Sequence, residues 1–592
     1  MSKVKVNFAF DDRQIEVEAG QKLSTICEEA GYSQDLVCGG NGKCGKCTVE
    51  INAGGVEQTV LSCRYEVNED ITVVKIFNLA NRKVNVLTTN SDLHCNINPK
   101  LEYLHVKGSD IVPDHCSSFM TKIHDKYRLN ITYRALQKLS FLAEVHNDNK
   151  DYYFVIYDND IIDVSTTDDP LYGLAVDIGS TTVAAYLYDM KEDKQISVYS
   201  QLNEQTTLGA DVISRISYAM KNEDGVGILR EKVCSTINEL LRQAREDDGF
   251  DTSKIYHAVF CGNSTMQHLF LGLYPGSLGH APFVSTTHHI VEMPARETPL
   301  DLNPDCMISF LPLLGGFVGA DTTAVLIGLP DDDKFRLTLD LGTNGELAVG
   351  NDERCLACST ACGPALEGAG LSSGMRAAVG ALQHFRINDD GSVYLDVIGG
   401  VEPIGICGSG IIDILGELVR VGLVNERGQL LTKDKWVRKF GENPIADRVV
   451  TLENDIKAFL VSDGEKKVYL TQLDIREIQK AKGAIAAGCA TLIKEYGIQP
   501  EELTEICLAG AFGNYLDVDQ AQRIGLFPTI EGVPVRSVGN GAGTGVQMFL
   551  LDKASVAKCY KIQRNVSHIE LDFIPGFQDT FFDQMLFKNA RK

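Results

Sequence analysis

The chain has 592 residues, of which 44% are apolar and 54 are glycine, and its formal net charge is −24. This length requires several domains, because a single hydrophobic core stops growing at about 250–300 residues. The acidic balance argues against a broad nucleic-acid surface, which needs a basic stripe. No apolar run reaches the about 18 residues of a membrane span. We therefore expect a large α/β protein that does not cross a membrane.

The first 76 residues show strand and helix patterns around a cysteine-rich loop. Polar and apolar residues alternate over 3–10 and 13–19, which predicts a β-hairpin. Residues 21–31 carry apolar side chains at helical spacing, and Cys27 on this stripe is expected in the core. Two more strands are predicted over 47–51 and 70–76.

Four cysteines of this region predict a [2Fe–2S] cluster. They are spaced C-x5-C-x2-C with a later fourth cysteine, namely Cys38, Cys44, Cys47 and Cys63. The cluster needs four thiolates around two irons, and a glycine-rich loop lets three of them come from one segment. Zinc would favour two C-x2-C pairs, and only one is present. The spacing resembles that of plant-type ferredoxins with one residue added to the first gap, which implies a β-grasp domain over 1–78.

The chain changes character after this domain. Residues 79–100 are polar, rich in asparagine and without periodicity, so we expect a linker that suits a mobile electron carrier. A helical pattern over 130–145 and two strand patterns over 151–166 follow. They predict a small α+β middle domain over 101–169.

A turn between two apolar strands over 172–189 carries the signs of a phosphate site. The first strand ends in Asp177, and the turn supplies Gly179 and three hydroxyls, those of Ser180, Thr181 and Thr182. Backbone N–H groups and hydroxyls can hold phosphates, and the carboxylate can hold the water shell of Mg²⁺. The pattern recurs over 337–350, where Asp340 precedes Gly342, Thr343, Asn344 and Gly345. This recurrence predicts two related half-domains that face one nucleotide.

A third glycine-rich turn follows a strand near the C-terminus. Gly510 and Gly513 precede a helical stretch, and such a pair lets the backbone approach an adenosine closely. In this order the three segments resemble the phosphate-1, phosphate-2 and adenosine elements of the actin, Hsp70 and sugar-kinase superfamily. The resemblance implies a duplicated RNase H-like ATPase domain over 170–592. The alternative is that the three glycine turns only cap buried strands.

Other candidate residues have less specific patterns. Asp321 and Asp413 each follow a glycine turn and could assist the metal or cap a helix. Cys355, Cys358 and Cys362 are spaced C-x2-C-x3-C, which could hold a second cluster or one shared between subunits. No fourth cysteine is close in sequence and small residues surround them, so packing is the favoured interpretation.

The whole chain resembles one family, the reductive activators of corrinoid-dependent enzymes. The segments that carry the resemblance are CGGNGKCGKC, VDIGSTTVAAYL, GADVISRI (209–216), LDLGTNGE, GPALEG and LAGAFGNYL. The resemblance implies ATP-dependent reduction of an inactive Co(II) corrinoid to methyl-accepting Co(I), in a methyltransferase or O-demethylase system of an anaerobe. Its cofactors would be the [2Fe–2S] cluster, ATP and Mg²⁺. Its partners would be a corrinoid protein and an external low-potential electron donor, and a homodimer is compatible with the family.

The resemblance also implies the roles of the site residues. Asp177 and Asp340 would position Mg²⁺ and the attacking water, the hydroxyl and amide side chains of the two turns would hold phosphates, and Gly510 and Gly513 would lie near adenosine. Seventeen cysteines without an apolar leader favour a reducing cytoplasm.

Two other functions stay open at this point. One is an ATP-dependent activator of a radical dehydratase, which would use a [4Fe–4S] cluster between two subunits. The other is a redox-sensing nucleotide-binding module, which would bind ATP without turnover.

Overall fold

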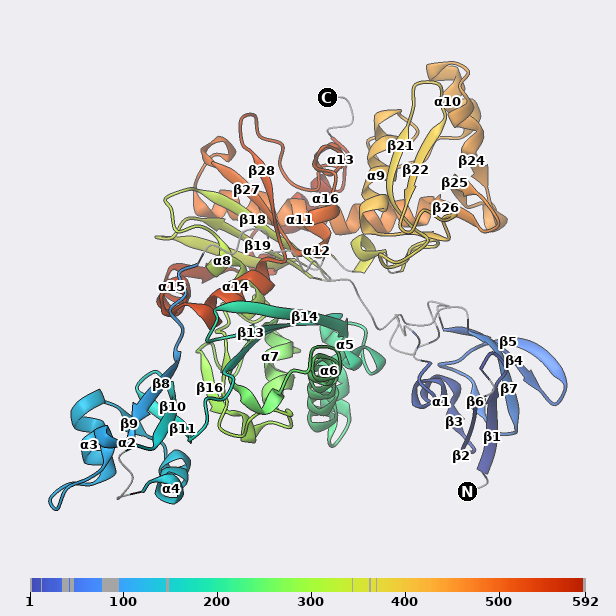
Figure 1. The fold of residues 1–592 in the computed structure, drawn as a ribbon. Coiled ribbons are helices and arrows are strands. Elements are labelled where there is room, and N and C mark those ends of the chain that lie inside the picture. Colours follow the sequence, from blue (N-terminus) through green and yellow to red (C-terminus); the bar gives the residue numbers. More distant parts are fainter. Residues whose placement is uncertain are drawn as a thin grey trace.

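A computed structural model describes residues 3–11, 13–32, 34, 42, 47–76, 95–144, 149–342, 344–360, 362, 364–368 and 370–588. Cys38, Cys44, Thr343 and residues 79–94 of the expected linker therefore lie outside the described residues. The described residues form four hydrophobic cores, one in each of two small N-terminal units and two in the remainder. Figure 1 shows the small units at opposite sides of two large lobes.

The N-terminal unit is a five-stranded sheet with one helix on it. The order is β2-β1-β7-β4-β5, and β1 and β7 are parallel. Helix α1 (Leu23–Glu29) buries Leu23, Ile26 and Cys27 on this sheet, so Cys27 is a core residue as predicted. The strands are β1 (Lys3–Phe8), β2 (Arg13–Glu18), β4 (Thr48–Ala53), β5 (Val56–Leu61) and β7 (Ile71–Ile76), with a small pair β3 (Gln21–Lys22) and β6 (Glu66–Val67).

The second small unit is a four-stranded sheet of order β8-β10-β11-β9. Its strands are β8 (Leu101–Lys107), β9 (Asn130–Ile131), β10 (Asp151–Tyr157) and β11 (Asp160–Ser165), and its helices are α2 (Gly108–Ile111), α3 (Phe119–Tyr127) and α4 (Tyr133–Leu142). Hydrogen bonds fix it to the first lobe. The Tyr157 hydroxyl donates to Glu292 at 2.7 Å, and the Tyr256 hydroxyl donates to Asp163 at 2.6 Å.

The two lobes repeat one topology. The sheet of the first lobe has the order β14-β13-β12-β15-β17-β16, and that of the second has β28-β27-β18-β19-β20-β29. In each lobe a central strand pairs antiparallel with the next strand of the chain and parallel with a later one. The order β14-β13-β12-β15-β17 of the first lobe therefore corresponds to β20-β19-β18-β27-β28 of the second, which shows a duplicated RNase H-like unit.

The strands of the first lobe are β12 (Tyr172–Ile178), β13 (Thr182–Asp189), β14 (Lys194–Leu202), β15 (Ile255–Gly262), β16 (Val291–Pro294) and β17 (Met307–Phe310). Those of the second are β18 (Arg336–Leu341), β19 (Gly345–Gly350), β20 (Cys355–Thr360), β27 (Glu505–Ala509), β28 (Val535–Gly539) and β29 (Val566–His568). The central strands are almost continuously apolar because helices cover both faces of the sheets.

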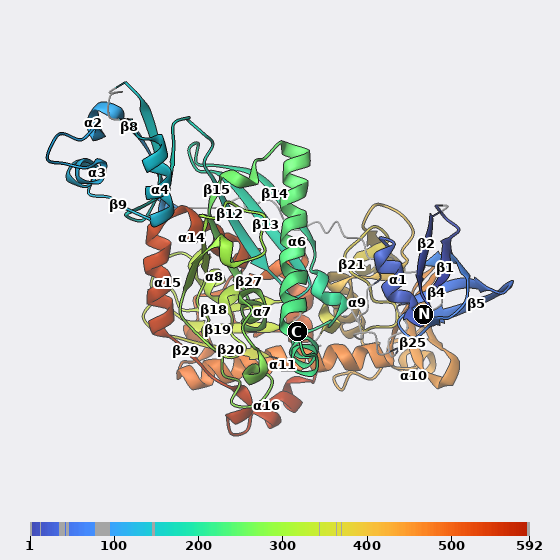
Figure 2. The ribbon, with the colours of Figure 1, turned by 90° about the horizontal axis from the view of Figure 1, so that it is seen from below.

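Helices α5 (Val212–Lys221), α6 (Gly225–Asp248), α7 (Ser264–Leu271) and α8 (Ala320–Gly328) belong to the first lobe. The second lobe has α11 (Gln472–Tyr496), α12 (Gly510–Tyr515), α13 (Val518–Ile524), α14 (Gly541–Leu551), α15 (Lys553–Asn565) and α16 (Phe577–Gln584). Figure 2 shows α11 running along this lobe with α16 beside it.

An insertion between β20 and α11 enlarges the second lobe. It contains α9 (Gly408–Arg420), α10 (Lys433–Phe440) and two small sheets of three strands each. The strands are β21 (Ala381–Ile387), β22 (Val393–Val397), β23 (Gly405–Ile406), β24 (Val449–Thr451), β25 (Lys457–Asp463) and β26 (Lys467–Thr471). In the described part of the chain, no helix combines the length and apolar character needed to traverse a lipid bilayer.

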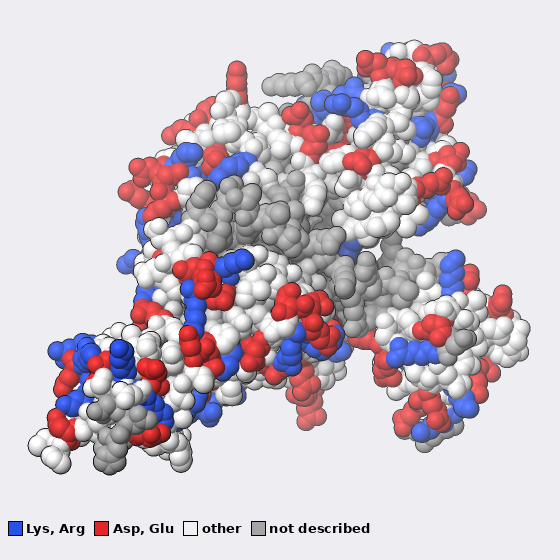
Figure 3. Space-filling view, in the orientation of Figure 1, with Lys and Arg blue, Asp and Glu red and all other residues white. Residues whose placement is uncertain are grey.

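Acidic and basic side chains are intermixed over the face drawn in Figure 3. Helix α14 crosses from the second lobe and packs on α8, β12 and β15 of the first. A Cβ built at Gly545 would lie 1.8 Å from the backbone oxygen of Ala324. The glycine thus lets the backbones of α14 and α8 touch.

We expect Gly545→Ala to destabilise the protein by about 1–3 kcal/mol, because a backbone oxygen cannot move aside as a side chain can. Gly328→Ala is the control, since its Cβ would meet nothing closer than 3.5 Å at the same helix pair. Thermal unfolding should show a lower midpoint for Gly545→Ala only. Equal midpoints for the two variants would contradict the close contact.

Candidate functional site

The first predicted phosphate turn joins β12 to β13, and neighbouring side chains hold its backbone. A Cβ at Gly179 would lie 2.5 Å from the carbonyl oxygen of Thr182, so this position requires glycine. The amide of Asn203 donates to the Gly179 oxygen at 3.0 Å, and that of Asn263 donates to Ser180 Oγ at 2.8 Å. The Ser180 hydroxyl is thereby fixed at the mouth of the turn.

Arg215 supports the same turn from below. Its guanidinium is fully buried and donates to the backbone oxygen of Ser180, to that of Gly209 at 2.9 Å and to Gln205 Oε1 at 3.1 Å. Burial lowers the pKa of Arg215 to about 9. Because carbonyl oxygens occupy its donors, Arg215 stiffens the turn and does not offer its charge to a ligand.

The second predicted turn joins β18 to β19 and repeats this geometry. Asp340, like Asp177, is the residue before the last of its strand. In both lobes a glycine at the end of the neighbouring parallel strand approaches the next carbonyl. A Cβ would lie 2.6 Å from the Ile178 oxygen at Gly262 and 2.8 Å from the Leu341 oxygen at Gly510. Gly510 has a positive φ of 87° and lies against Asp340 as well. Gly513 is buried in α12, and the backbone N–H of Gly342 donates to the Asn344 oxygen at 3.0 Å.

Four buried carboxyl groups, two from each lobe, lie within electrostatic reach of one another. Asp177 and Asp321 belong to the first lobe, and Asp340 and Glu346 belong to the second. Asp340 and Glu346 face each other across the β18–β19 pair, so their side chains share one face of the sheet. Oε1 of Glu346 is buried and has no hydrogen-bond partner among the described residues.

Burial raises the pKa values of all four groups, and repulsion from other carboxyl groups adds to the shift at Asp321, Asp340 and Glu346. Burial raises the pKa of Asp177 to about 6. Burial and then Asp177 raise that of Asp321 to about 6, and burial with Asp321 and Asp177 raises that of Asp340 to about 8. The pKa of Glu346 is well above its usual range because of burial, Asp321 and Asp340. No lysine or arginine is among these causes. The negative charge of the four carboxyl groups is therefore available to a bound cation.

This acidic seam, defined by Asp177, Asp321, Asp340 and Glu346, fits magnesium bound with a nucleotide. Carboxylate oxygens are the ligands that Mg²⁺ prefers, and it usually keeps several waters and takes phosphates as well. Among the described residues no three acidic, cysteine or histidine side chains converge as a ready metal cage. The seam therefore suits an ion that arrives with its own water and phosphate ligands.

The N-terminus of α14 also reaches Asp177 from the second lobe. Asn540, the cap of this helix, bonds Asp177 and donates to the Tyr186 hydroxyl at 2.9 Å. The thiol of Cys261 lies 3.7 Å from Asp177 Oδ1 and 3.8 Å from the backbone oxygen of Ala542. The positive end of a helix thus faces the carboxylate, which links the position of α14 to whatever Asp177 binds.

The N-terminal unit places two of the predicted cluster ligands together. Cys47 and Cys63 are each 1% exposed, and their sulfur atoms are 3.1 Å apart without a disulfide. Gly42 in the same loop has a φ of 70°, which favours glycine. Two adjacent buried thiols fit a shared metal cluster. Cys38 and Cys44 lie outside the described residues, so their placement stays a prediction.

The three later cysteines do not converge. Cys355 and Cys358 lie three positions apart on β20, which directs their side chains to opposite faces of the sheet. They belong to different hydrophobic cores, and burial raises the pKa of Cys355 to about 12. This arrangement favours the packing interpretation. Asp413 accepts hydrogen bonds from His384 at 3.0 Å and from the Phe385 backbone at 3.2 Å, away from the acidic seam.

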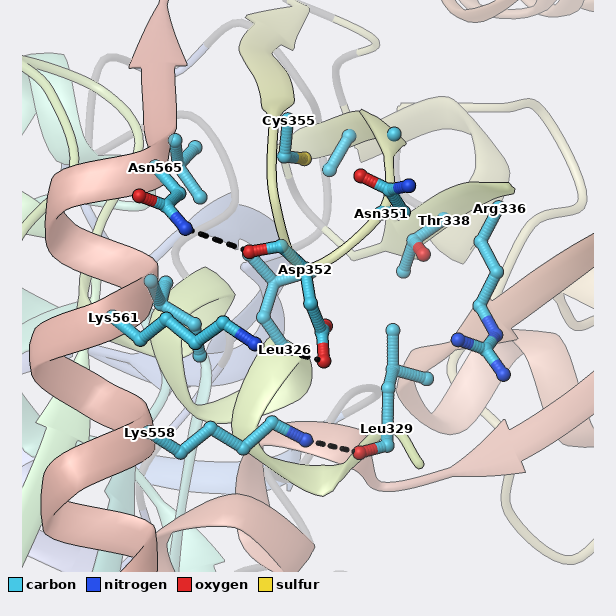
Figure 4. A pocket seen from close by; sticks show the side chains of 14 residues that line it. Leu326, Leu329, Arg336, Thr338, Asn351, Asp352, Cys355, Lys558, Lys561 and Asn565 are labelled. Atoms are coloured by element: carbon cyan, nitrogen blue, oxygen red, sulfur yellow. Dashed lines mark hydrogen bonds and ion pairs between the residues drawn. The ribbon is translucent and has the colours of Figure 1, made fainter. Parts of the chain in front are cut away.

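Figure 4 shows a separate cavity of about 40 Å³ beneath the connection between the lobes. Lys558 Nζ donates to the Leu329 oxygen, Lys561 lies 3.5 Å from Asp352, and Asn565 donates to the Asp352 backbone at 2.7 Å. Nucleotide sites need several hundred Å³. The polar groups that line this cavity bond each other and so stabilise the connection between the lobes. The cavity is too small to be a nucleotide site.

Comparisons with known proteins agree with this architecture. Residues 8–70 match the model of the 2Fe-2S iron-sulfur cluster binding domain, residues 172–330 that of the RACo middle region, and residues 334–592 that of the C-terminal domain of RACo, the ASKHA domain. A corrinoid activation enzyme, RamQ of Eubacterium limosum, is 40% identical over 99% of both chains.

The chain therefore belongs to the family of reductive activators of corrinoid proteins. A reductase of Methanosarcina barkeri that acts on a Co(II) methylated amine-specific corrinoid protein is 26% identical over 60% of this chain and 66% of its own. The solved structure of a reductive activator for a corrinoid, iron-sulfur protein is 29% identical, covers 98% of both chains and superposes with a TM-score of 0.72.

Membership in this family of reductive activators confirms the family, the fold class and the cofactors that the sequence predicted. The matched models assign a [2Fe–2S] domain and an ASKHA domain, the class that binds ATP, usually with Mg²⁺. Sequence reasoning missed Arg215, Asn540 and Glu346. Arg215 lies in the GADVISRI segment and Glu346 ends LDLGTNGE, so both were in recognised segments, but no pattern shows which side chain points into the seam.

The acidic seam predicts that Mg²⁺ and pH act together on stability. In a chelator the native protein binds more protons than the unfolded chain between about pH 4 and 8, because the pKa values of Asp177, Asp321 and Asp340 are raised. The free energy of unfolding should therefore fall as pH rises through this window. We expect Asp340→Asn to match the wild type near pH 4 and to exceed its stability by a few kcal/mol at pH 8, as an order of magnitude.

Thermal unfolding at pH 5, 6.5 and 8, with chelator or Mg²⁺, checks this expectation. Mg²⁺ should stabilise the wild type most at pH 8 and should stabilise Asp340→Asn less. If the stabilities of the two proteins changed with pH in the same way, the pKa of Asp340 would not be raised in the native protein.

Proposed function

We propose that this protein reduces the cobalt of a corrinoid protein by one electron, from inactive Co(II) to methyl-accepting Co(I), in an ATP-dependent step of a methyltransferase or O-demethylase system. The observation that carries the proposal is the 40% identity, over 99% of the chain, to a corrinoid activation enzyme. The thiol pair of the N-terminal unit and the acidic seam of the lobes supply the two chemistries that such an activator needs.

Cys38, Cys44, Cys47 and Cys63 would hold the [2Fe–2S] cluster. When bound, the cluster passes one electron at a time at a potential of about −400 mV for the plant type. An external low-potential donor supplies the electron, and the Co(II) centre of the partner accepts it without a change in bonds to this protein. Each 59 mV by which the acceptor is harder to reduce costs a factor of about ten in equilibrium. ATP is useful where this difference is unfavourable.

The seam residues and the turns would bind the nucleotide. Asp177 and Asp340 would position Mg²⁺ and the attacking water. Phosphates would lie against the two turns, which contain Gly179, Ser180, Thr181, Thr182, Gly342, Thr343, Asn344 and Gly345, and adenosine near Gly510 and Gly513. A nucleotide that touches both lobes stabilises their closed arrangement. ATP can influence electron transfer only by favouring one such arrangement over another.

The division of the chain is part of the proposal. The ferredoxin-like domain would span residues 1–78, the linker 79–100, the small middle domain 101–169 and the ATPase domain 170–592. Residues near the end of this linker lie against the second lobe, where the Asn98 backbone bonds Leu551 and Lys553 at 2.8 Å each. A mobile carrier domain would move about this anchored end, in the cytoplasm, and a homodimer would be visible by sedimentation.

The direct test mixes the titanium(III)-reduced protein with a Co(II) corrinoid protein, with and without ATP. We expect the visible spectrum of Co(I) to form only with ATP and Mg²⁺. A non-hydrolysable ATP analogue separates binding from turnover. Co(I) formation that ignored ATP, or no Co(I) with any corrinoid protein offered, would refute the proposal.

Cys47→Ser should remove cluster-dependent reduction and leave ATP binding unchanged, because Cys47 lies in the N-terminal unit far from the seam in sequence. Iron and sulfide counts and the visible spectrum report the cluster, and equilibrium ATP binding reports the ATPase domain. Cys116→Ser is the control, since Cys116 is exposed and outside the cluster loop. An intact two-iron spectrum in Cys47→Ser would contradict its role as a ligand.

Asp177→Ala should abolish ATP hydrolysis and leave the visible spectrum of the cluster unchanged. Losing a carboxylate that positions the ion and the water should cost at least about 100-fold in kcat. Asp247→Asn, an exposed residue of α6, serves as the control. Unaltered ATP-dependent reduction by Asp177→Ala would mean that the nucleotide binds elsewhere.

A further inference from the structure

Glu346 is a member of the acidic seam that the duplicated fold does not require. The two lobes are built alike, so each residue of one seam hairpin has a counterpart in the other. Asp177 faces Ala184 across the β12–β13 pair, and Asp340 faces Glu346 across the β18–β19 pair. The same fold therefore accepts alanine where the second lobe has glutamate.

The surroundings of Glu346 also argue against a structural role. Its side chain is 6% exposed, yet Oε1 has no hydrogen-bond partner among the described residues. Another buried glutamate of the second lobe shows the contrast. Glu417 is 1% exposed and accepts four bonds, from Arg420 twice, from Gln520 and from the Ile387 backbone, at 2.7–2.9 Å. A buried carboxyl oxygen without a partner destabilises the fold, so the position of Glu346 needs another explanation.

The location of Glu346 supplies that explanation. It lies on the second lobe beside Asp340, and its charge interacts with Asp321 of the first lobe and with Asp340, whereas Asp177 is not among its electrostatic partners. Glu346 thus lies beside Asp340 in the seam, with one buried carboxyl oxygen that has no described partner. Such an acceptor in a magnesium–nucleotide site can accept a hydrogen bond from a water that approaches the terminal phosphate.

We propose that Glu346 is a further catalytic residue, which accepts a hydrogen bond from the water that attacks the γ-phosphate of ATP and so orients it. This inference rests on the proposed function. In hydrolysis the water oxygen bonds to the γ-phosphorus, and the bond from that phosphorus to the bridging oxygen breaks with its electron pair left on ADP. Both water protons leave with inorganic phosphate, from which one exchanges with solvent, so Glu346 keeps no proton.

The test compares Glu346→Gln and Glu346→Ala with Glu417→Gln. We expect both Glu346 variants to lower kcat for ATP hydrolysis by about 100–1,000-fold, while KM and the equilibrium affinity for Mg²⁺-ATP change less than about threefold. Their thermal midpoints should equal or exceed that of the wild type, because a repulsive carboxyl group is gone. Glu417→Gln should lower the midpoint and keep kcat.

A structural role for Glu346 gives the opposite pattern, with lower midpoints and nearly normal kcat, and overturns the inference. A loss of Mg²⁺-ATP affinity equal to the loss of kcat also overturns it, since Glu346 would then hold the ion or the nucleotide. If the wild-type protein reduces the corrinoid with ATP and the Glu346 variants hydrolyse ATP normally, the role of Glu346 is refuted and the proposed function is not. Wild-type protein without ATP turnover refutes the proposed function as well.

Discussion

The central constraint of the structure is a set of four buried carboxyl groups from two lobes, and no basic residue of the described chain is among the causes of their pKa shifts. Burial alone disfavours their charge, and each further carboxyl group disfavours it more. A divalent ion bound with its nucleotide would relieve this repulsion. Because the carboxyl groups belong to both lobes, such binding would favour the closed arrangement of the lobes.

The close packing of α8 and α14 limits how these two helices can move when an ion binds at the seam. The two helices touch through Gly545 and Ala324, and α14 reaches Asp177 through its cap, Asn540. A movement of α14 relative to β12 would therefore change the position of the helix end that faces this carboxylate. Packed interfaces of this kind switch between discrete arrangements more readily than they deform.

Much of this architecture could be predicted from the sequence, and the failures have physical causes. Apolar strands that end in Asp177 and Asp340 repeat a recognisable pattern, because buried strands and glycine turns are local properties. Strand β5 was missed because most of its residues are exposed, as on a sheet edge, and its apolar residues do not alternate. The insertion after β20 was also missed. Glu346 was overlooked because its meaning lies in its cross-strand neighbour Asp340 and in Asp321 of the other lobe.

The duplication also explains why the two lobes are not interchangeable. Symmetry supplies the pair Asp177 and Asp340, and divergence adds Glu346 where its counterpart is Ala184. At the second position of the equivalent helices α8 and α14, divergence adds Asp321 opposite Ala542. A symmetric pair of carboxylates can bind an ion midway between the lobes, but hydrolysis takes place at only one end of the phosphate chain. The two added carboxyl groups make the seam asymmetric, and each occupies a position where the fold accepts alanine.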